Sequence, residues 1–154
     1  MINEQTIQKT VEAFIKDTDI FLVQVKVKPG NKIEVFVDQP NHISIETCRS
    51  LSKHIEANLN RDEEDFELMV SSPGIDEAFK VSSQYKKYKG KQVSILKTDG
   101  VKLIGSLGDI TNDTVELETK TTERQKAGKG RHTIIENITI NLHTIKETKL
   151  ILPF

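Results

Sequence analysis

Along residues 1–70, apolar residues recur with the period of a helix in some segments and with the period of a strand in others. Apolar residues recur three or four positions apart from residue 7 to 15 and from 45 to 59, which places each set on one helical face. Asn3 and Ser44 precede these segments and are of the types that cap helices. The second helix is expected to pack through Ile45, Cys48, Leu51, Ile55 and Leu59.

Strict alternation over residues 21–27, 33–37 and 66–70 predicts three strands, the first two joined at the Pro29-Gly30 turn. The predicted order is α-β-β-α-β. In that order both helices can cover one face of a three-stranded sheet, which makes a two-layer domain.

Beyond a polar connector at residues 82–84 the period is that of strands alone. The Asp99-Gly100 pair is a hairpin signal, and apolar positions continue to Leu152. We expect five short strands in a small closed barrel. Residues 121–131 are polar, basic and glycine-containing, so a mobile loop is expected there. The fold class is therefore α+β, with domains at residues 1–83 and 84–154.

Charge is divided unevenly between these two domains, although the 154-residue chain has a net charge of only -1. Residues 1–83 carry 9 lysines and arginines against 15 aspartates and glutamates, whereas residues 84–154 carry 13 against 8. Phosphate would repel the first domain and attract the second. This polarity favours an adaptor, although an incidental division explains the charges equally well.

Cysteine and histidine offer no metal site or disulfide. Cys48 is the single cysteine, and no cluster supplies the four ligands of a structural zinc site. The first residues lack a secretory signal, and no apolar run reaches the roughly 20 residues that span a bilayer. We expect a cytoplasmic protein without cofactors, in which Cys48 packs in the core.

Several short stretches occur in an order and spacing typical of one family. They are Val35-Phe36-Val37-Asp38, then Glu46-Thr47-Cys48 with Leu51-Ser52-Lys53, then Leu68-Met69-Val70-Ser71-Ser72-Pro73-Gly74, and in the second half Tyr85, Gly90, Val93 and Gly105-Ser106-Leu107. Together they resemble the ribosome maturation factor RimP family over essentially the whole chain. The stretch that ends in Pro73-Gly74 is the most specific.

The resemblance implies an N-terminal α/β domain followed by an SH3-like or Sm-like barrel, in a monomeric, non-enzymatic factor for late maturation of the small (30S) ribosomal subunit. It also implies two partners: the free small subunit and, within it, the twelfth small-subunit ribosomal protein. The basic charge of the second domain adds small-subunit rRNA as an expected partner. After Gly74 the family commonly continues with Asp-Arg-Pro-Leu, whereas this chain keeps Asp76 and has Glu77 in place of the basic residue. A role that needs a cation there is therefore in doubt.

Three sets of residues are candidates for function. Ser71, Ser72, Pro73, Gly74 and Asp76 form a candidate interdomain junction that holds the barrel at a fixed angle, with Asp76 bonding nearby amides. The alternative is a plain turn at the end of a strand. Candidate contacts with RNA or ribosomal protein are Lys86, Lys87, Lys89 and Lys91, beside Tyr85 and Tyr88, and Arg124, Lys126, Lys129 and Arg131. The alternative for both basic sets is a solvated surface.

Three hypotheses remain open. The leading one is an assembly factor that binds the immature small subunit without catalysis. A second is a generic Sm-like RNA-binding module, which would show a steep salt dependence on unrelated RNAs. A third is a small hydrolase that uses Ser72 or Asp76, although no base, metal site or phosphate loop accompanies them.

Overall fold

The computed structural model describes the backbone of residues 1–124 and 131–152, and the side chains of residues 1–120 and 133–152. The chain forms two compact units, Met1–Gly74 and Ile75–Phe154. The division falls at Gly74 rather than at residue 83. Phe79 explains the difference, because its ring packs on the core of the second unit and its N–H donates to the Thr148 carbonyl at 2.8 Å.

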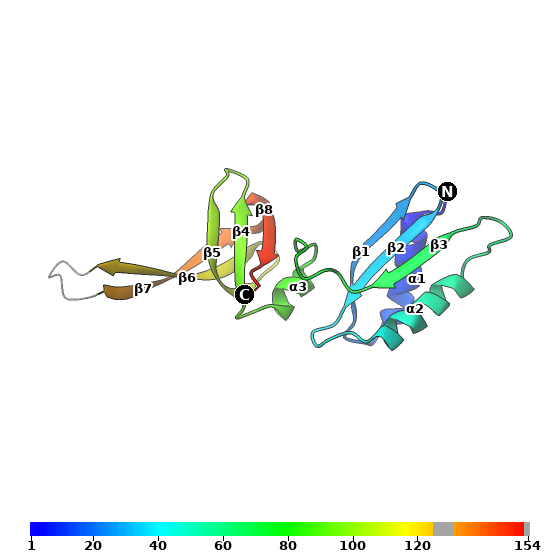
Figure 1. Ribbon diagram of the computed structural model, residues 1–154, viewed down its shortest axis with the longest axis horizontal. Coiled ribbons are helices and arrows are strands. Elements are labelled where there is room, and N and C mark those ends of the chain that lie inside the picture. The colour runs from blue at the N-terminus through cyan, green and yellow to red at the C-terminus, as the bar shows by residue number, and fades with distance from the viewer. Residues whose placement is uncertain (125–130, 153–154) are drawn as a thin grey trace. The chain divides into compact units, whose positions relative to one another are not determined.

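The first unit has the predicted α-β-β-α-β order. Its elements are α1 (Glu4–Ile15), β1 (Phe21–Lys28), β2 (Lys32–Asp38), α2 (Ile45–Ala57) and β3 (Glu67–Ser71). The sheet order is β1-β2-β3, with β1 antiparallel and β3 parallel to β2. Figure 1 shows α1 and α2 on the same side of this sheet, which confirms the two-layer arrangement.

Both expected caps are present. The Asn3 side chain accepts from the Gln5 N–H at 2.7 Å, and the Ser44 hydroxyl accepts from the Thr47 N–H at 3.1 Å. The helices bury their apolar stripes, including Ile7 and Leu51, against the β2 valines. Ile45 was wrongly expected in that stripe and is 72% exposed. Helical side chains lean toward the N-terminus, so the first residue of α2 leans beyond the packed turns.

Asn31 ties the ends of this unit together. It follows Gly30 in the β1–β2 turn, and both residues have positive φ, a conformation that Gly and Asn tolerate best. Its side-chain amide donates to Glu64 and to the Asp65 carbonyl, and its oxygen accepts from the Ile2 N–H at 2.9 Å. The hairpin turn thereby fixes both the start of the chain and the loop before β3.

The second unit begins with a helix that the sequence pattern did not predict, α3 (Ser82–Lys87). Five strands follow: β4 (Gln92–Lys97), β5 (Lys102–Ile110), β6 (Thr114–Arg124), β7 (Arg131–Asn141) and β8 (Ile145–Leu150), with the 3₁₀ turn η1 (Leu142–Thr144) before β8. The sheet is antiparallel, in the order β7-β6-β5-β4-β8. Five strands were expected, but β5, β6 and β7 are longer than expected.

The connection between the two edge strands requires this sheet to coil. A flat sheet of five strands spaced about 4.8 Å apart would separate its edges by roughly 19 Å. Only η1 joins Asn141 at the end of β7 to Ile145 at the start of β8, and four fully extended residue steps reach at most about 14 Å. The strands therefore curve around one core, which contains Val93, Ile95, Leu107, Val115, Leu117 and Ile140.

Coiling stops short of the closed barrel that we expected. Within the described residues, β7 pairs only with β6 and β8 only with β4, so no ladder joins the two edges. What the structure shows is an α+β chain with two sheets, the second strongly curved.

Candidate functional site

The candidate junction residues begin at the last residue of β3. The Ser71 hydroxyl donates to the Ser72 carbonyl at 3.0 Å, Pro73 is half-buried, and the first unit ends at Gly74. Asp76 is exposed, and no hydrogen bond joins it to a backbone amide in the part of the chain that the structure describes. Asp76 interacts instead through its charge, with a nearby lysine.

Asp76 and Glu77 lie near a lysine of β8. The pKa of Lys149 is raised by its hydrogen bond to Glu147, at 2.9 Å, and further by the negative charges of Glu77 and Asp76. The pKa of Glu147 is lowered in turn, first by Lys149 and then by neighbouring lysines. Glu77, the residue that departs from the family pattern, thus faces a cation of its own unit.

The sequence suggested that Tyr85 and Tyr88 present free rings to a base. In the structure both rings pack against other residues of the second unit. The Tyr85 ring meets Phe79 edge-on at 5.1 Å between centroids, and its hydroxyl lies 2.7 Å from that of Thr148. The Tyr88 ring stacks on that of Phe79, with 5.4 Å between centroids. Both rings therefore attach α3 to the sheet, because aromatic packing and a satisfied hydroxyl make that site favourable.

The four lysines of the first basic set differ in their surroundings. Lys89 forms an ion pair with Asp109 of β5, and this hydrogen bond raises the pKa of Lys89. The Lys87 ammonium lies 5.4 Å from the centroid of the Tyr88 ring. Lys86 and Lys91 are exposed and are therefore best placed to meet an anionic partner.

Two members of the second basic set, Arg124 and Arg131, lie at the end of a two-stranded ribbon. β5 follows β6 only as far as the Ser106↔Glu118 pair, so Thr119–Arg124 pairs with β7 alone. The backbones of these two residues are paired in register, while Lys126 and Lys129 lie outside the described residues. Figure 1 shows the ends of β6 and β7 extending away from β5 and β4. Part of the expected loop is thus strand.

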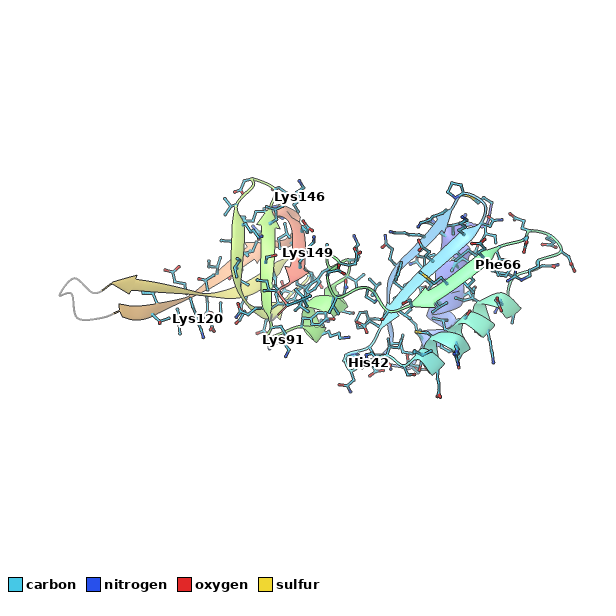
Figure 2. The ribbon with its side chains drawn as sticks, in the orientation of Figure 1. His42, Phe66, Lys91, Lys120, Lys146 and Lys149 are labelled. Atoms are coloured by element: carbon cyan, nitrogen blue, oxygen red, sulfur yellow. The ribbon has the colours of Figure 1, made fainter. Side chains whose placement is uncertain are left out.

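Sequence reasoning passed over further exposed lysines of the second unit, among them Lys120 on β6 and Lys146 and Lys149 on β8. Figure 2 shows them, with Lys91, at separate places around the curved sheet. Isolated lysines on alternating strand positions give no cluster along the chain, so only the folded sheet reveals that cations surround it.

Among the described residues no three His, Cys, Asp or Glu side chains come close enough to share a metal ion. His42 and His143 are exposed, and His54 packs against Phe14. Within the described chain no helix has the length and apolar character to traverse a lipid bilayer.

Cys48 is buried on α2, as expected from its place in the apolar stripe. Burial raises the pKa of its thiol, and the negative charge of Asp38 raises it further. A thiol held protonated in a core is a poor nucleophile, so packing accounts for this residue.

Comparison with known proteins gives consistent matches. Residues 10–76 match the model of the RimP N-terminal domain. A protein of Porphyromonas gingivalis named Ribosome maturation factor RimP is 32% identical over 96% of this chain and 97% of its own length. Proteins of the same name from Christiangramia forsetii and Flavobacterium psychrophilum are 29% and 32% identical, over 100% and 88% of both chains respectively.

The fold and the candidate residues define a class: a two-unit α+β protein whose candidate functional groups are charged side chains on its surface. The extent of the matches makes the assignment specific. The chain belongs to the RimP family, which confirms the resemblance seen in its motifs.

Proposed function

We propose that this protein is a ribosome maturation factor that binds the immature small (30S) ribosomal subunit. The observation that carries the proposal is the match, over almost the full length, to relatives named Ribosome maturation factor RimP. Binding stabilises one conformation of the immature subunit through differential affinity, without covalent chemistry, and release follows when maturation removes that difference. The protein works in the cytoplasm as a monomer.

The distribution of charge supports a ribonucleoprotein as the partner. The second unit carries 14 lysines and arginines against 10 acidic residues, and the first carries 8 against 13. The basic unit engages small-subunit rRNA and the twelfth small-subunit ribosomal protein. Phosphate contacts of this kind position a protein without reading sequence, so the shape of the particle supplies the specificity.

The contacts are assigned to two places on the basic unit. Lys86, Lys87, Lys89 and Lys91 form the first, with Lys86 and Lys91 the more accessible. The ribbon with Arg124, Lys126, Lys129 and Arg131 forms the second. Coiling of the sheet through η1 supports an SH3-like or Sm-like barrel as the scaffold of these contacts.

Ser71, Ser72, Pro73, Gly74 and Asp76 are proposed as the interdomain junction. Proline restricts the backbone and the Ser71 hydroxyl bonds locally, so the connector has fewer conformations than a glycine-serine linker of the same length. Its stiffness would limit how the two units orient on the particle.

Co-sedimentation with free small subunits tests the function. The full chain should pellet with them at low salt and dissociate as salt rises. Reversing charge in Lys86→Glu/Lys91→Glu should weaken association about tenfold or more, since each lost phosphate contact removes a counterion-release contribution. The matched control is Lys9→Glu/Lys16→Glu, two exposed lysines of the acidic unit. Failure of the unaltered protein to pellet with free small subunits would refute the proposal.

A further inference from the structure

The two edges of the β1-β2-β3 sheet are not equivalent. At the β1 edge, the Val27 N–H donates to the Glu4 carboxylate at 3.1 Å, so the first turn of α1 occupies part of that edge. A backbone donor that is already bonded is not available to an added strand. The β1 edge is therefore partly closed by the chain itself.

The β3 edge is open. The Glu67 N–H donates to the carbonyl of Asn31, the residue before β2, at 3.0 Å, and the parallel register continues from Glu67 to Ser71. In a parallel ladder alternate residues direct both backbone groups to the same neighbour, so Glu67 and Met69 face β2 while Leu68 and Val70 point outward. Within residues 1–124 and 131–152, neither outward pair of backbone groups has a hydrogen-bond partner outside the sheet.

An apolar side chain and a hollow adjoin this edge. Met69 points to the sheet face away from the helices and is 43% exposed. A hollow of about 250 Å³ lies beside it, lined by Lys28, Lys32, Ile33, Glu34, Glu67, Leu68 and Met69. A strand added next to β3 would place alternate side chains on this face, at the level of the hollow.

Charge at the edge selects the occupant. The loop that enters β3 contains Asp62, Glu63, Glu64 and Asp65, and Glu67 follows on the strand itself. All five side chains are exposed. Phosphate would be repelled there, and a second copy would bring two acidic units of like net charge together. A cationic polypeptide meets neither penalty.

We propose that the β3 edge binds an extended, lysine- or arginine-rich segment of another protein by strand addition. The outward backbone groups of Leu68 and Val70 supply the pairing, Met69 and the adjoining hollow receive side chains, and the acidic residues attract the segment. This surface goes beyond the proposed function, because it is defined on the acidic unit and needs no rRNA contact.

The test uses the full-length protein and an eight-residue peptide in which lysine and valine alternate, with both ends blocked. Amide hydrogen exchange is followed by NMR. Leu68 and Val70 amides should exchange rapidly in the free protein and at least about tenfold more slowly with saturating peptide, because pairing protects them. Peptide binding that leaves both amides unprotected would overturn the proposal.

Peptide variants separate backbone pairing from charge. Methylation of every peptide nitrogen should weaken binding about tenfold or more, because the donors are lost. Glutamate in place of each lysine should weaken it similarly. Equal affinity for the methylated or glutamate peptide would contradict strand addition or charge selection, respectively. Protection of the same amides by single-stranded oligouridine would show an RNA site instead.

Protein variants locate the site. Glu67→Lys should weaken binding of the lysine peptide about fivefold and strengthen binding of the glutamate peptide. Glu46→Lys makes the same charge change on exposed α2 and should leave both affinities unchanged. Met69→Lys and Ile45→Lys form a second pair of exposed apolar positions, of which only the first should weaken binding. Equal effects within either pair would place the peptide elsewhere. Co-sedimentation is scored separately, so failure of this site leaves the ribosomal function intact.

Discussion

The hydroxyl oxygens of Tyr85 and Thr148 lie 2.7 Å apart and join α3 to β8 across the core of the second unit. Thr148 is 1% exposed, so its hydroxyl depends on this bond. Tyr85→Phe should lower the free energy of unfolding by about 1–2 kcal/mol, because a buried hydroxyl is left without its partner. Urea unfolding followed by circular dichroism measures the loss.

The double variant Tyr85→Phe/Thr148→Val provides the control. Removing both polar partners leaves no unsatisfied group, so the double variant should be more stable than the sum of the two single losses indicates. Strict additivity would show that the two hydroxyls do not bond in solution.

Alkaline pH should destabilise the second unit through the same tyrosine. Burial raises the pKa of Tyr85, and the hydrogen bond to Thr148 opposes this only in part. Because the folded pKa lies above the unfolded value of about 10, the protonated phenol's contribution is complete below pH 10 and is lost as the pH rises through the folded pKa. The free energy of unfolding, measured from pH 9 to 11, should decline less in Tyr85→Phe than in the unaltered chain.

Arg61 should stabilise the loop before β3 through geometry that lysine does not reproduce. Its guanidinium lies 4.0 Å from the centroid of the Phe66 ring, donates to the Phe66 carbonyl at 2.8 Å and also bonds Glu56 and Asp65. The ion pairs are half-exposed and contribute little. The ring and carbonyl contacts predict a loss of about 1 kcal/mol in Arg61→Lys. Arg49→Lys, on the exposed face of α2, should change stability negligibly in parallel urea titrations.

Gly105 is required by the close approach of β5 to β6. A Cβ at this position would strike the backbone carbonyl of Glu118, whereas the exposed turn residue Gly90 has open space around it. Gly105→Ala should therefore destabilise the second unit by about 1–3 kcal/mol through overpacking. Thermal unfolding would show a lower midpoint, and refolding at low temperature distinguishes a weakened sheet from aggregation. An unchanged midpoint would mean that β5 and β6 can separate without cost.

Local sequence signals predicted the first unit well because each element satisfies its own rules. Asn3 and Ser44 cap their helices, and the strand alternation matches the buried residues of β2. The prediction that Ile45 packs in the core was wrong, because its position on the apolar stripe does not show whether a neighbour lies beyond the first turn of α2. Helix α3 was missed because Ser82-Ser83 reads as polar connector, and its stability comes from tertiary aromatic packing.

The candidate site was less predictable because surface residues obey few local rules. Tyr85 and Tyr88 alternate with lysines as in a nucleic-acid-binding segment, yet Phe79 and Thr148 draw both rings inward. Closure of a sheet into a barrel depends on contacts between residues far apart in sequence. The alternation in β4 to β8 therefore predicted strands, but it did not predict that β7 and β8 remain unpaired with each other over the residues that the structure describes.

The ribbon can be shortened to test its contribution without disturbing its pairing. Arg124 and Arg131 are paired in register, so replacing residues 125–130 with Asn-Gly should close a two-residue hairpin between them. This change removes Lys126 and Lys129 while leaving β6 and β7 in place. If the ribbon contacts rRNA, affinity for free small subunits should fall and the slope of log affinity against log salt should decrease by about 1–2, one for each lost phosphate contact.

Replacing the same residues with a six-residue glycine-serine segment that lacks lysine separates loss of charge from loss of length. Unaltered affinity and slope in both variants would remove the ribbon from the interface and leave Lys86 and Lys91 as the principal contacts.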